Sequence, residues 1–480
     1  MDKICIQKGS GPDYDFARQL QNARFNLYPI EICYCANEPE VQKHLEDAKP
    51  GFVRIRSGGH HHEGMCSGTD VRIIDVSKIQ HIQIKDDVLT VGPGAKLGKI
   101  YNELWKTRRL LPGGGCPDVC VGGLAQGGGW GLYSRYLGLT CDRLIGFRMV
   151  RANGKIVDAT KGDPAYEKLF KAVCGGGGGN FGVITEFRFQ LARLESEIWS
   201  FTVEWADPNS SEVYRNWRVN FPNNADRKLT SFLRYTVAGG AVDDKPIVLA
   251  GNYVGSQAEM EKALIRQLPD AWSTKSNYKP ERVDVVKDGQ QVYQHPEYQP
   301  GPPLEALRAL PHLAGVSDEK LRDLSSTCAG IPYPHKISSC YPNLAFIRGG
   351  ISTMHTYLSD SARKPESSAR RYVSLHGMGG AIKDANDWSS YAFRHYDYLL
   401  QYQAWWANKD QKDVETRCIE WVEGFRKALK AWTEYSFINF PDHKVPIEDY
   451  YGDSFAELIE VKKEYDEHGL FDFPMGIPRS

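Results

Sequence analysis

The stretch Arg56-Ser57-Gly58-Gly59-His60 decides the fold, because it sets a glycine-rich loop between two short apolar runs. We expect these runs, residues 52–56 and 71–76, to be strands bounded by turn residues. Two more glycine-dense stretches follow at 112–131 and 175–182. Glycine permits positive φ and close backbone approach, and successive N–H groups can bind an anion. The three stretches predict a long, doubly charged ligand such as a dinucleotide, gripped mainly by backbone. Three tight turns without a ligand are the alternative.

The third stretch contains Gly177-x-Gly179-x-x-Gly182, which matches the dinucleotide pattern of Rossmann domains. That pattern binds pyrophosphate only where it follows a strand and opens a helix. We expect the reverse order here, with a helix at 163–172 and a strand at 181–191. A Rossmann domain is therefore rejected.

Other patterns predict the remaining elements. A helix is expected at 95–108, and a hairpin over 145–159 that turns at Asn153-Gly154. After Leu191, strand-like runs alternate with helical stretches, which is typical of an α+β domain. The expected elements there are strands at 198–205, 232–237 and 247–253, a helix at 257–267, and a surface loop at 279–303.

Length and charge exclude several classes of function. A chain of 480 residues exceeds the size of a single hydrophobic core, so two domains are expected. The formal net charge is −1, from 59 basic and 60 acidic residues, which leaves no surplus for nucleic acid or anionic lipid. No apolar run has the length of a membrane span, and the N-terminus lacks the apolar core of a signal peptide.

The eleven cysteines are odd in number and widely scattered. We therefore expect reduced thiols in a cytoplasmic protein rather than a disulfide framework. Cys33 with Cys35, and Cys116 with Cys120, do not have the spacing of a zinc site, so no metal is expected.

Three consecutive histidines, His60, His61 and His62, raise the question of a metal site. Adjacent residues on an extended chain point to opposite sides, so three in a row rarely ligate one ion. We expect His61 and His62 to be exposed loop residues. His60 differs, because Gly58 and Gly59 bring its backbone against whatever fills the loop.

At this point the chain resembles a known family, the berberine bridge enzyme-like oxidases of the vanillyl-alcohol oxidase superfamily. Arg56 to His60 resembles the family's covalent flavin motif, and Gly115-Cys116-Pro117-Asp118-Val119 its second attachment loop. Further motifs follow in the family's order across nearly the whole chain. These are Gly127 to Gly131, Leu139 to Asp142, Gly178 to Ile184, Asn439 to Asp442, Tyr450 to Gly452, and Val461 to Asp466.

The resemblance implies an α+β, two-domain fold of the PCMH type. Residues 1–193 would form the FAD-binding domain, and 431–480 a C-terminal segment that completes it. Residues 194–430 would form a substrate domain that lays an antiparallel sheet over the flavin.

The resemblance also implies the cofactor, an FAD bonded to His60 and Cys116. These two bonds would make the flavin more oxidising and leave an open cavity without loss of the cofactor. Cys141 and Cys120 are alternative thiols, and attachment without any cysteine is a third possibility. The flavin contacts implied are Arg56, Ser57, Gly58, Gly59, His60, Cys116, Val121, Gly122, Gly123, Gly127, Gly128, Trp130, Gly131, Cys141, Asp142, Gly179, Gly182, Val183, Ile184, Phe437 and Asn439.

The chain departs from the family at Trp130 and Phe437, where many relatives place tyrosines that abstract a proton. Neither replacement can act as a base, so both are interpreted as aromatic packing and the base is sought elsewhere. Tyr435 is the first candidate, because it would share one face of an extended strand with Phe437 and Asn439. His395 and Tyr133 are further candidates, and Gln401 could tune a tyrosine by hydrogen bonding.

The function expected is an oxidase that removes hydride from an alcohol, sugar or amine carbon of a small molecule, in natural-product biosynthesis. O2 would reoxidise the flavin, and Val119 lies where the family gates oxygen, so its small side chain favours an oxidase over a dehydrogenase. The alternatives are oxidative ring closure, dehydrogenation without O2, or a flavin-binding protein that has lost catalysis. The protein would be a monomer or a homodimer.

Overall fold

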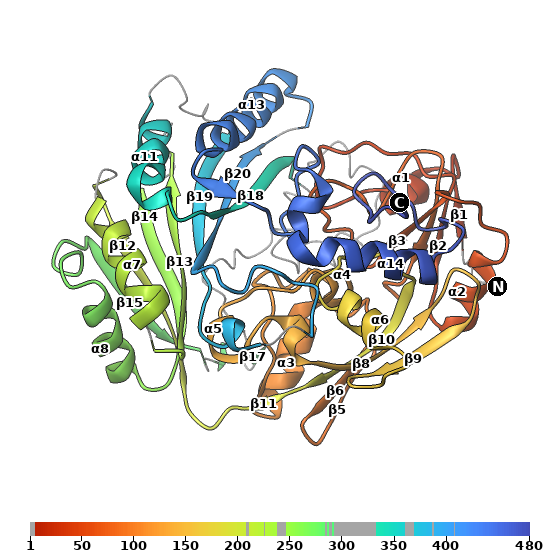
Figure 1. The fold of residues 1–480 in the computed structure, drawn as a ribbon, viewed down its shortest axis with the longest axis horizontal. Helices are drawn as coiled ribbons and strands as arrows, with labels where there is room; N and C mark the ends of the chain where they lie inside the picture. Colours follow the sequence, from red (N-terminus) through yellow and green to blue (C-terminus); the bar gives the residue numbers. More distant parts are fainter. Residues whose placement is uncertain are drawn as a thin grey trace.

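The computed structural model describes residues 5–207, 211–224, 226–237, 246–283, 286–287, 290–291, 333–360, 369–385, 388–407 and 409–480. Figure 1 shows two groups of sheets. The N-terminal part, red to yellow, carries a four-stranded sheet, a five-stranded sheet and the short pair of β7 (Arg109–Leu110) with β11 (Ala192–Arg193). The middle of the chain, green to blue, carries a larger sheet of eight strands.

The first sheet has the strand order β1-β2-β4-β3. Its strands are β1 (Cys5–Gln7), β2 (Glu31–Tyr34), β4 (Arg72–Asp75) and β3 (Val53–Arg56). The two strands predicted around the first glycine loop are confirmed, and they pair in parallel. The loop that carries His60 therefore leaves the carboxyl end of β3 and returns over the sheet to β4.

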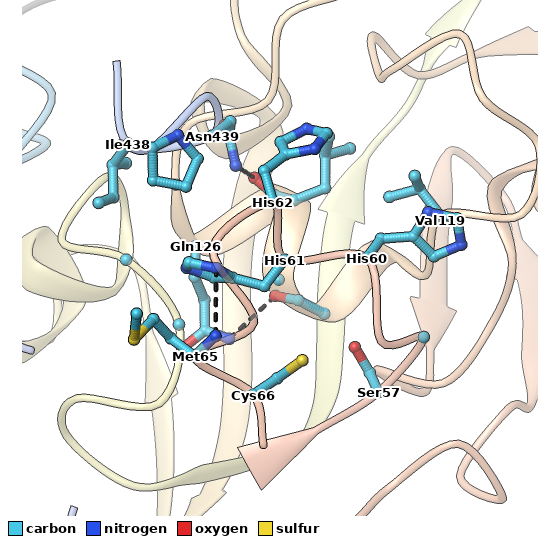
Figure 2. Close-up of a pocket in the computed structure, with 18 of the residues that line it drawn as sticks. Ser57, His60, His61, His62, Met65, Cys66, Val119, Gln126, Ile438 and Asn439 are labelled. Carbon is cyan, nitrogen blue, oxygen red and sulfur yellow. Dashed lines mark hydrogen bonds between the residues drawn. The ribbon is translucent and has the colours of Figure 1, made fainter. Parts of the chain in front are cut away.

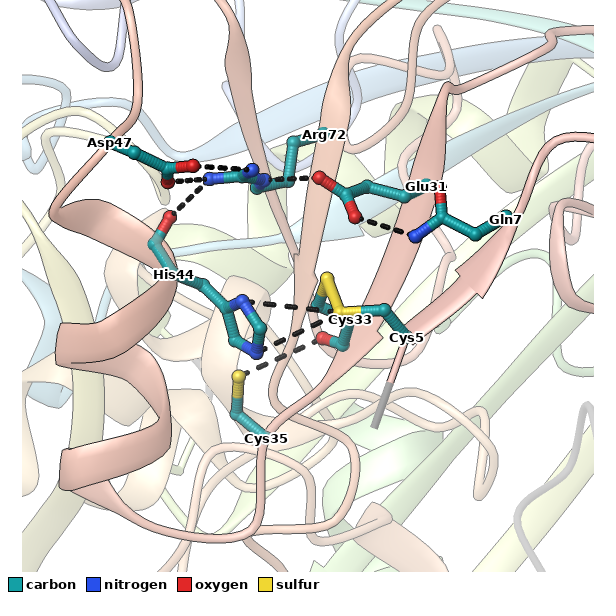
Figure 3. The surroundings of a disulfide bond; sticks show 8 residues. All are labelled: Cys5, Gln7, Glu31, Cys33, Cys35, His44, Asp47 and Arg72. Atoms are coloured by element: carbon teal, nitrogen blue, oxygen red, sulfur yellow. Dashed lines mark hydrogen bonds and ion pairs between the residues drawn. A yellow bond between two sulfur atoms is a disulfide. The ribbon is translucent and has the colours of Figure 1, made fainter. Parts of the chain in front are cut away.

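A disulfide joins Cys5 of β1 to Cys33 of β2 (Figure 3). The two residues are direct partners in the antiparallel pair, although 28 positions separate them in the sequence. The Nε2 atom of His44, on α2 (Glu38–Leu45), lies 3.7 Å from the Cys5 sulfur. The expectation of reduced thiols is wrong for this pair, because a count of cysteines carries no information on strand pairing. The cytoplasmic location was inferred from reduced thiols, so this disulfide removes one argument for it.

The second sheet has the order β5-β6-β10-β8-β9. Its strands are β5 (Ile82–Lys85), β6 (Val88–Val91), β10 (Val183–Gln190), β8 (Leu144–Val150) and β9 (Ile156–Thr160). The predicted hairpin is confirmed as β8 and β9, with Gly154 at φ 76° in its turn. Helices α3 (Leu97–Lys106) and α6 (Glu167–Val173) are slightly shorter than predicted. Since α6 precedes the third glycine run and β10 follows it, the order is the reverse of a Rossmann domain.

The third sheet has eight strands in the order β15-β12-β14-β13-β19-β20-β18-β21, all antiparallel. This sheet confirms the predicted α+β fold class. The strands are β15 (Asn277–Arg282), β12 (Ile198–Trp205), β14 (Ile247–Val254), β13 (Leu229–Thr236), β19 (Ala369–Gly377), β20 (Tyr398–Trp406), β18 (His335–Pro342) and β21 (Thr433–Glu434).

The surface loop predicted at 279–303 is wrong over 279–282, which belong to β15. The proline at position 280 lies on an edge strand, where a missing backbone N–H is tolerated. Residues 286–287 and 290–291 form a short hairpin, β16 (Val286–Lys287) and β17 (Gln290–Gln291). Residues 284–285, 288–289 and 292–303 lie outside the described part of the chain.

The two faces of the large sheet have different partners, because successive side chains of a strand point to opposite sides. On β20 the even-numbered residues, such as Leu400 and Tyr402, pack into a core with the helices. These helices are α7 (Ser211–Asn224), α8 (Gln257–Gln267), α11 (Ile351–Ser359) and α13 (Lys412–Leu429). The odd-numbered Gln401, Gln403 and Trp405 face away from them and line a cavity.

The C-terminal segment returns to the N-terminal part, where α14 (Phe455–Tyr465) lies beside α6 (Figure 1). Lys171 of α6 and Glu457 of α14 form an ion pair of 2.7 Å. Among the described residues, no helix combines the length and apolarity that a membrane crossing requires.

Candidate active site

A cavity of about 400 Å³ lies between the glycine loops and the large sheet. One wall comes from the three glycine stretches, and the opposite wall from β18, β19 and β20. Figure 2 shows the loop wall, with His60 beside Val119. The predicted residues that line the cavity are Ser57, Gly58, Gly59, His60, Cys116, Val119, Gly122, Gly123, Gly127, Trp130, Gly179, Gly182, Ile184, Gln401, Phe437 and Asn439.

At some glycines of the loop wall, a side chain would not collide with any other part of the protein. A Cβ on Gly123 would meet nothing within 4 Å, and one on Gly178 or Gly179 would meet only ordinary contacts at 3.4 Å or more. All three line the cavity. The space beside their Cα atoms suits a ligand that packs against bare backbone, so the loop wall fits a dinucleotide such as FAD.

Other glycines are required by the protein itself. A Cβ on Gly131 would lie 1.6 Å from the carbonyl oxygen of Gly113. Gly128 has φ 114°, a conformation that residues with a side chain rarely adopt. Gly128, Gly131, Val121 and Val183 lie outside the cavity lining. Gly128 and Gly131 shape the second loop, whereas Val121 begins α4 (Val121–Gln126) and Val183 begins β10.

Side chains from the C-terminal segment complete the loop wall. The Asn439 Oδ1 atom accepts a hydrogen bond from the backbone N–H of Gly129 at 2.9 Å. Its Nδ2 atom donates to the carbonyl of Leu124 at 3.3 Å. Lys462 of α14 donates to the carbonyl of Asn180, which lies in the third glycine loop, at 2.9 Å.

His60 and Cys116, the residues expected to hold the flavin, both line this cavity and are half-buried. Burial lowers the pKa of His60 to about 4, against the opposing effect of the Asp118 carboxylate. The imidazole is therefore neutral at ordinary pH and carries the lone pair that a bond to carbon requires.

The other cysteine thiols near the cavity are less suited than Cys116 to bond the flavin. Cys120 lines the cavity, but it is buried and donates to the carbonyl of Gly94 at 3.3 Å, and burial raises its pKa to about 12. Cys141 is fully buried outside the cavity lining, where burial also raises its pKa. Cys66 lines the cavity and was missed from the sequence, because it belongs to no motif. Burial raises its pKa as well.

Arg56 and Asp142 were expected to contact the flavin, but neither lines the cavity. The Arg56 Nε atom binds Asp75 at 2.5 Å in a buried ion pair that joins β3 to β4. Asp142 binds Arg394 through both carboxylate oxygens, at 2.6 and 3.0 Å. Both side chains hold the scaffold.

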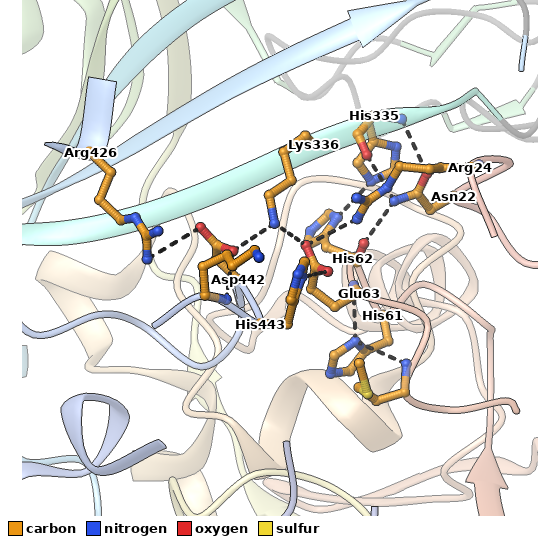
Figure 4. Close-up of polar contacts among 12 residues, drawn as sticks. Asn22, Arg24, His61, His62, Glu63, His335, Lys336, Arg426, Asp442 and His443 are labelled. Carbon is orange, nitrogen blue, oxygen red and sulfur yellow. Dashed lines mark hydrogen bonds and ion pairs between the residues drawn. The ribbon is translucent and has the colours of Figure 1, made fainter. Parts of the chain in front are cut away.

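The expectation that His61 and His62 are exposed is wrong: both are half-buried and line the cavity. The His61 Nδ1 atom accepts from the backbone N–H of Glu63 at 3.2 Å. The His62 Nδ1 atom lies 3.0 Å from Nε2 of His335 on β18, as Figure 4 shows. The loop turns back at these residues toward the sheet, which the sequence pattern did not reveal.

The three base candidates lie outside the cavity lining. Tyr435 is 38% exposed and stacks on Phe393. Its φ of 52° breaks the strand alternation on which the prediction rested. His395 is exposed, and Tyr133 is buried among apolar residues.

Gln401 lines the cavity as predicted, but its side chain contacts a histidine and not a tyrosine. The His376 Nε2 atom lies 3.0 Å from Gln401 Oε1. The His376 ring also packs edge-on against Trp130, with ring centres 4.5 Å apart. Trp130 itself donates to the carbonyl of Gly377 at 3.0 Å, so it ties the loop wall to β19.

A buried charge cluster fastens the His62 loop to the sheet and to the C-terminal segment (Figure 4). The Lys336 ammonium binds Glu63 at 2.7 Å and Asp442 at 2.6 Å, and all three side chains are at most 1% exposed. Arg24 and His443 also bind Glu63. Although burial alone would raise it, these partners lower the pKa of Glu63 to about 2. Glu63, Asp442 and His443 could together hold a metal ion. Lys336 supplies the positive charge among these carboxylates instead.

Comparison with known proteins agrees with this architecture. The FAD binding domain family matches residues 29–160, and the berberine and berberine-like family matches residues 436–478. The FAD-linked oxidoreductase YgaK of Bacillus subtilis is 29% identical, and the match covers 97% of this chain and 95% of YgaK. The chitooligosaccharide oxidase of Gibberella zeae is 25% identical, over 95% of this chain and 88% of that protein.

A solved structure extends the similarity to the fold. The berberine bridge enzyme-like protein 1 of Physcomitrella patens superposes with a TM-score of 0.79 at 22% identity, covering 99% of this chain and 96% of the other. The chain is thus an FAD-binding, berberine bridge enzyme-like oxidoreductase, with a PCMH-type FAD-binding domain and a berberine-like C-terminal region.

Proposed function

We propose that this protein is an oxidase whose FAD is bonded to both His60 and Cys116, and that it oxidises an uncharged, hydroxylated small molecule with O2 as the electron acceptor. When bound, FAD supplies the hydride acceptor. The observation that carries the proposal is the joint position of His60 and Cys116 in one cavity whose glycine wall leaves room for a dinucleotide.

The cavity lining supports an uncharged substrate. Among the described lining residues, Arg54 is the only one with a permanent charge. Its guanidinium donates to the carbonyls of Gly51, Val53 and Asp472. The sheet wall offers amides, imidazoles and aromatic rings, which suit hydroxyl groups better than a carboxylate or an ammonium ion.

The relatives support an oxidase. One of them is named for the oxidation of chitooligosaccharides, which are hydroxylated molecules. Val119, which lines the cavity beside His60, supports the same reading by its small size. The protein is expected to reoxidise rapidly in air, and slow reoxidation in stopped flow would assign it as a dehydrogenase.

The test of attachment is the intact mass of the denatured protein. The mass should exceed that of the sequence by one FAD. His60→Ala and Cys116→Ala should each keep one bond, and the double variant should release flavin on denaturation. Cys120→Ala is the matched control and should leave attachment unchanged. Unchanged attachment in Cys116→Ala would refute the cysteine assignment.

The test of substrate class is bleaching of the flavin under anaerobic conditions by N,N′-diacetylchitobiose, cellobiose, glucose and benzyl alcohol. Gluconate and glucosamine serve as charged counterparts. The neutral alcohols should bleach the flavin faster. Faster bleaching by a charged counterpart would contradict the inference from the lining.

A further inference from the structure

His62 and His335 form a fixed pair at the sheet wall of the cavity. Their Nδ1 and Nε2 atoms lie 3.0 Å apart. The His335 ring is buried and stacks on Trp405 of β20, with ring centres 4.1 Å apart. Asn22 donates to the backbone carbonyls of His62 and His335, at 2.7 and 3.0 Å. The pair therefore has little freedom to change its geometry.

The hydrogen bonds determine which nitrogen of each ring carries the proton. The His335 Nδ1 atom lies 2.9 Å from the carbonyl of Tyr333, and because a carbonyl only accepts, Nδ1 carries the hydrogen. Burial lowers the pKa of His335 to about 3, so the ring is neutral and its Nε2 atom accepts. His62 then donates from Nδ1. Since His62 is also neutral, its Nε2 atom holds a lone pair.

The His62 Nε2 atom has no hydrogen-bond partner within the described part of the chain, and His62 lines the cavity. The neighbouring His61 has the opposite tautomer. Its Nδ1 atom accepts from the backbone N–H groups of Glu63 and Met65, so its neutral ring carries hydrogen on Nε2. Of these two adjacent imidazoles, only His62 can accept a proton from a ligand.

The amides of the sheet wall act as donors. Trp405 Nε1, which can only donate, binds Gln403 Oε1 at 2.8 Å, so the NH2 group of Gln403 points elsewhere. Gln401 Oε1 is similarly engaged by His376. Both glutamines line the cavity. Donors are thus available to hold a substrate oxygen, whereas His62 is the acceptor.

We propose that His62 is the catalytic residue that takes the proton of the substrate hydroxyl, and that His335 is the positioning residue that keeps the His62 Nε2 lone pair available. This inference rests on the proposed oxidation of an alcohol. The O–H bond breaks and its electron pair forms the C=O bond. The C–H pair leaves as hydride to the FAD, and the proton passes to His62 Nε2.

The surroundings of His62 set its protonation state. Burial and the imidazoles of His335, His61 and His60 lower the pKa of His62, whereas the Glu63 carboxylate raises it. The ring is therefore unprotonated before the reaction. The proton that arrives is stabilised by Glu63, and the Nδ1–H bond to His335 stays in place.

The first test needs no substrate. Nitrogen-15 labelling of histidine, with His62→Gln to assign the signals, reports the tautomer of each ring in the flavin-loaded protein. His62 should carry hydrogen on Nδ1, and His61 on Nε2. Hydrogen on Nε2 of His62 would overturn the inference even if the attachment of FAD is confirmed.

The second test measures the rate of flavin reduction by the alcohol that bleaches the wild type in the screen above. His62→Gln should lower this rate by about 10²–10⁴-fold, the range for a lost general base. The intact mass should still show one FAD, which separates this result from a failure of attachment. His468→Gln, whose ring is 77% exposed, is the matched control and should reduce at the wild-type rate.

Tyr372 of β19 is the competing proton acceptor on the sheet wall. A loss of this size in Tyr372→Phe, with His62→Gln near the wild type, would overturn the inference. If no alcohol in the screen bleaches the wild type, the tautomer measurement decides alone.

The positioning role of His335 has its own test. His335→Gln keeps an oxygen that can accept from His62 Nδ1, whereas His335→Leu does not. The glutamine variant should recover most of the rate lost in the leucine variant, and its nitrogen-15 spectrum should keep the His62 Nδ1–H tautomer. Equal rates and equal spectra in the two variants would refute the positioning role.

Discussion

The two walls of the cavity are built in different ways. The loop wall uses main chain: glycines such as Gly123 and Gly179 leave bare backbone toward the ligand. The sheet wall uses side chains: Gln401, Gln403 and Trp405 come from alternate positions of one strand. A main-chain wall can bind any ligand with the shape of the cofactor. Side chains of the sheet wall can be substituted without disturbing the loop wall. The choice of substrate is thereby separated from the binding of FAD.

The loop wall can be broken most severely at Gly131. Gly131→Ala would place a Cβ 1.6 Å from the Gly113 carbonyl, so we expect loss of folded protein. Gly123→Ala is the matched variant, because its Cβ meets nothing within 4 Å of the protein. It should keep the wild-type melting temperature when flavin-free and bind less flavin. Equal flavin content in Gly123→Ala and the wild type would show that this wall is not the cofactor surface.

The next target is the buried charge cluster of Lys336, Glu63 and Asp442, which joins the loop wall to the sheet wall. Lys336→Met leaves the Glu63 and Asp442 carboxylates buried without their ammonium partner, so the free energy of unfolding should fall by about 3–5 kcal/mol. Lys383→Met removes a half-exposed pair with Asp397 and should cost less than about 1 kcal/mol. Denaturant unfolding compares the two, and equal losses would contradict a special role for the buried cluster.

The buried charge cluster also predicts that the stability of the protein depends on pH. The folded-state pKa of Glu63 is lowered from its ordinary 4.5 to about 2. Its contribution to stability is therefore complete above pH 4.5 and is lost as the pH falls toward 2. The difference in melting temperature between Lys336→Met and the wild type should narrow over this window. A constant difference would mean that Glu63 does not depend on Lys336.

The smallest effect is expected on the sheet wall. Gln403→Leu removes one donor, worth about 1 kcal/mol, so KM for the bleaching alcohol should rise about fivefold with little change in kcat. The amount of covalent flavin should not change, and steady-state oxygen uptake with the intact mass measures both. Loss of flavin in Gln403→Leu would contradict the independence of the two walls.

The contrast between the loop wall and the sheet wall also explains which parts of the site could be predicted from the sequence. The loop wall could be predicted because glycine runs are visible as composition, and His60 and Cys116 lie within them. The partners on the sheet wall could not, since His376 meets Gln401 through strand pairing across 25 positions. Tyr435 lies outside the cavity lining for a local reason, because its left-handed φ ends the strand alternation that would have turned its side chain to the cavity. Cys5 and Cys33 repeat the lesson, because their contact exists only through the register of β1 and β2.

The closure of the loop wall by Asn439 and Lys462 has a consequence for biosynthesis. Both residues lie in the last tenth of the chain, yet they bind glycine loops at 124–129 and 180. A nascent chain emerges from the ribosome N-terminus first, so the FAD-binding loops are synthesised long before the residues that hold them. The hydrogen bonds that close the loop wall can therefore form only after nearly the whole polypeptide has been made. A ribosome that stalls before position 439 yields a chain whose glycine loops lack these bonds.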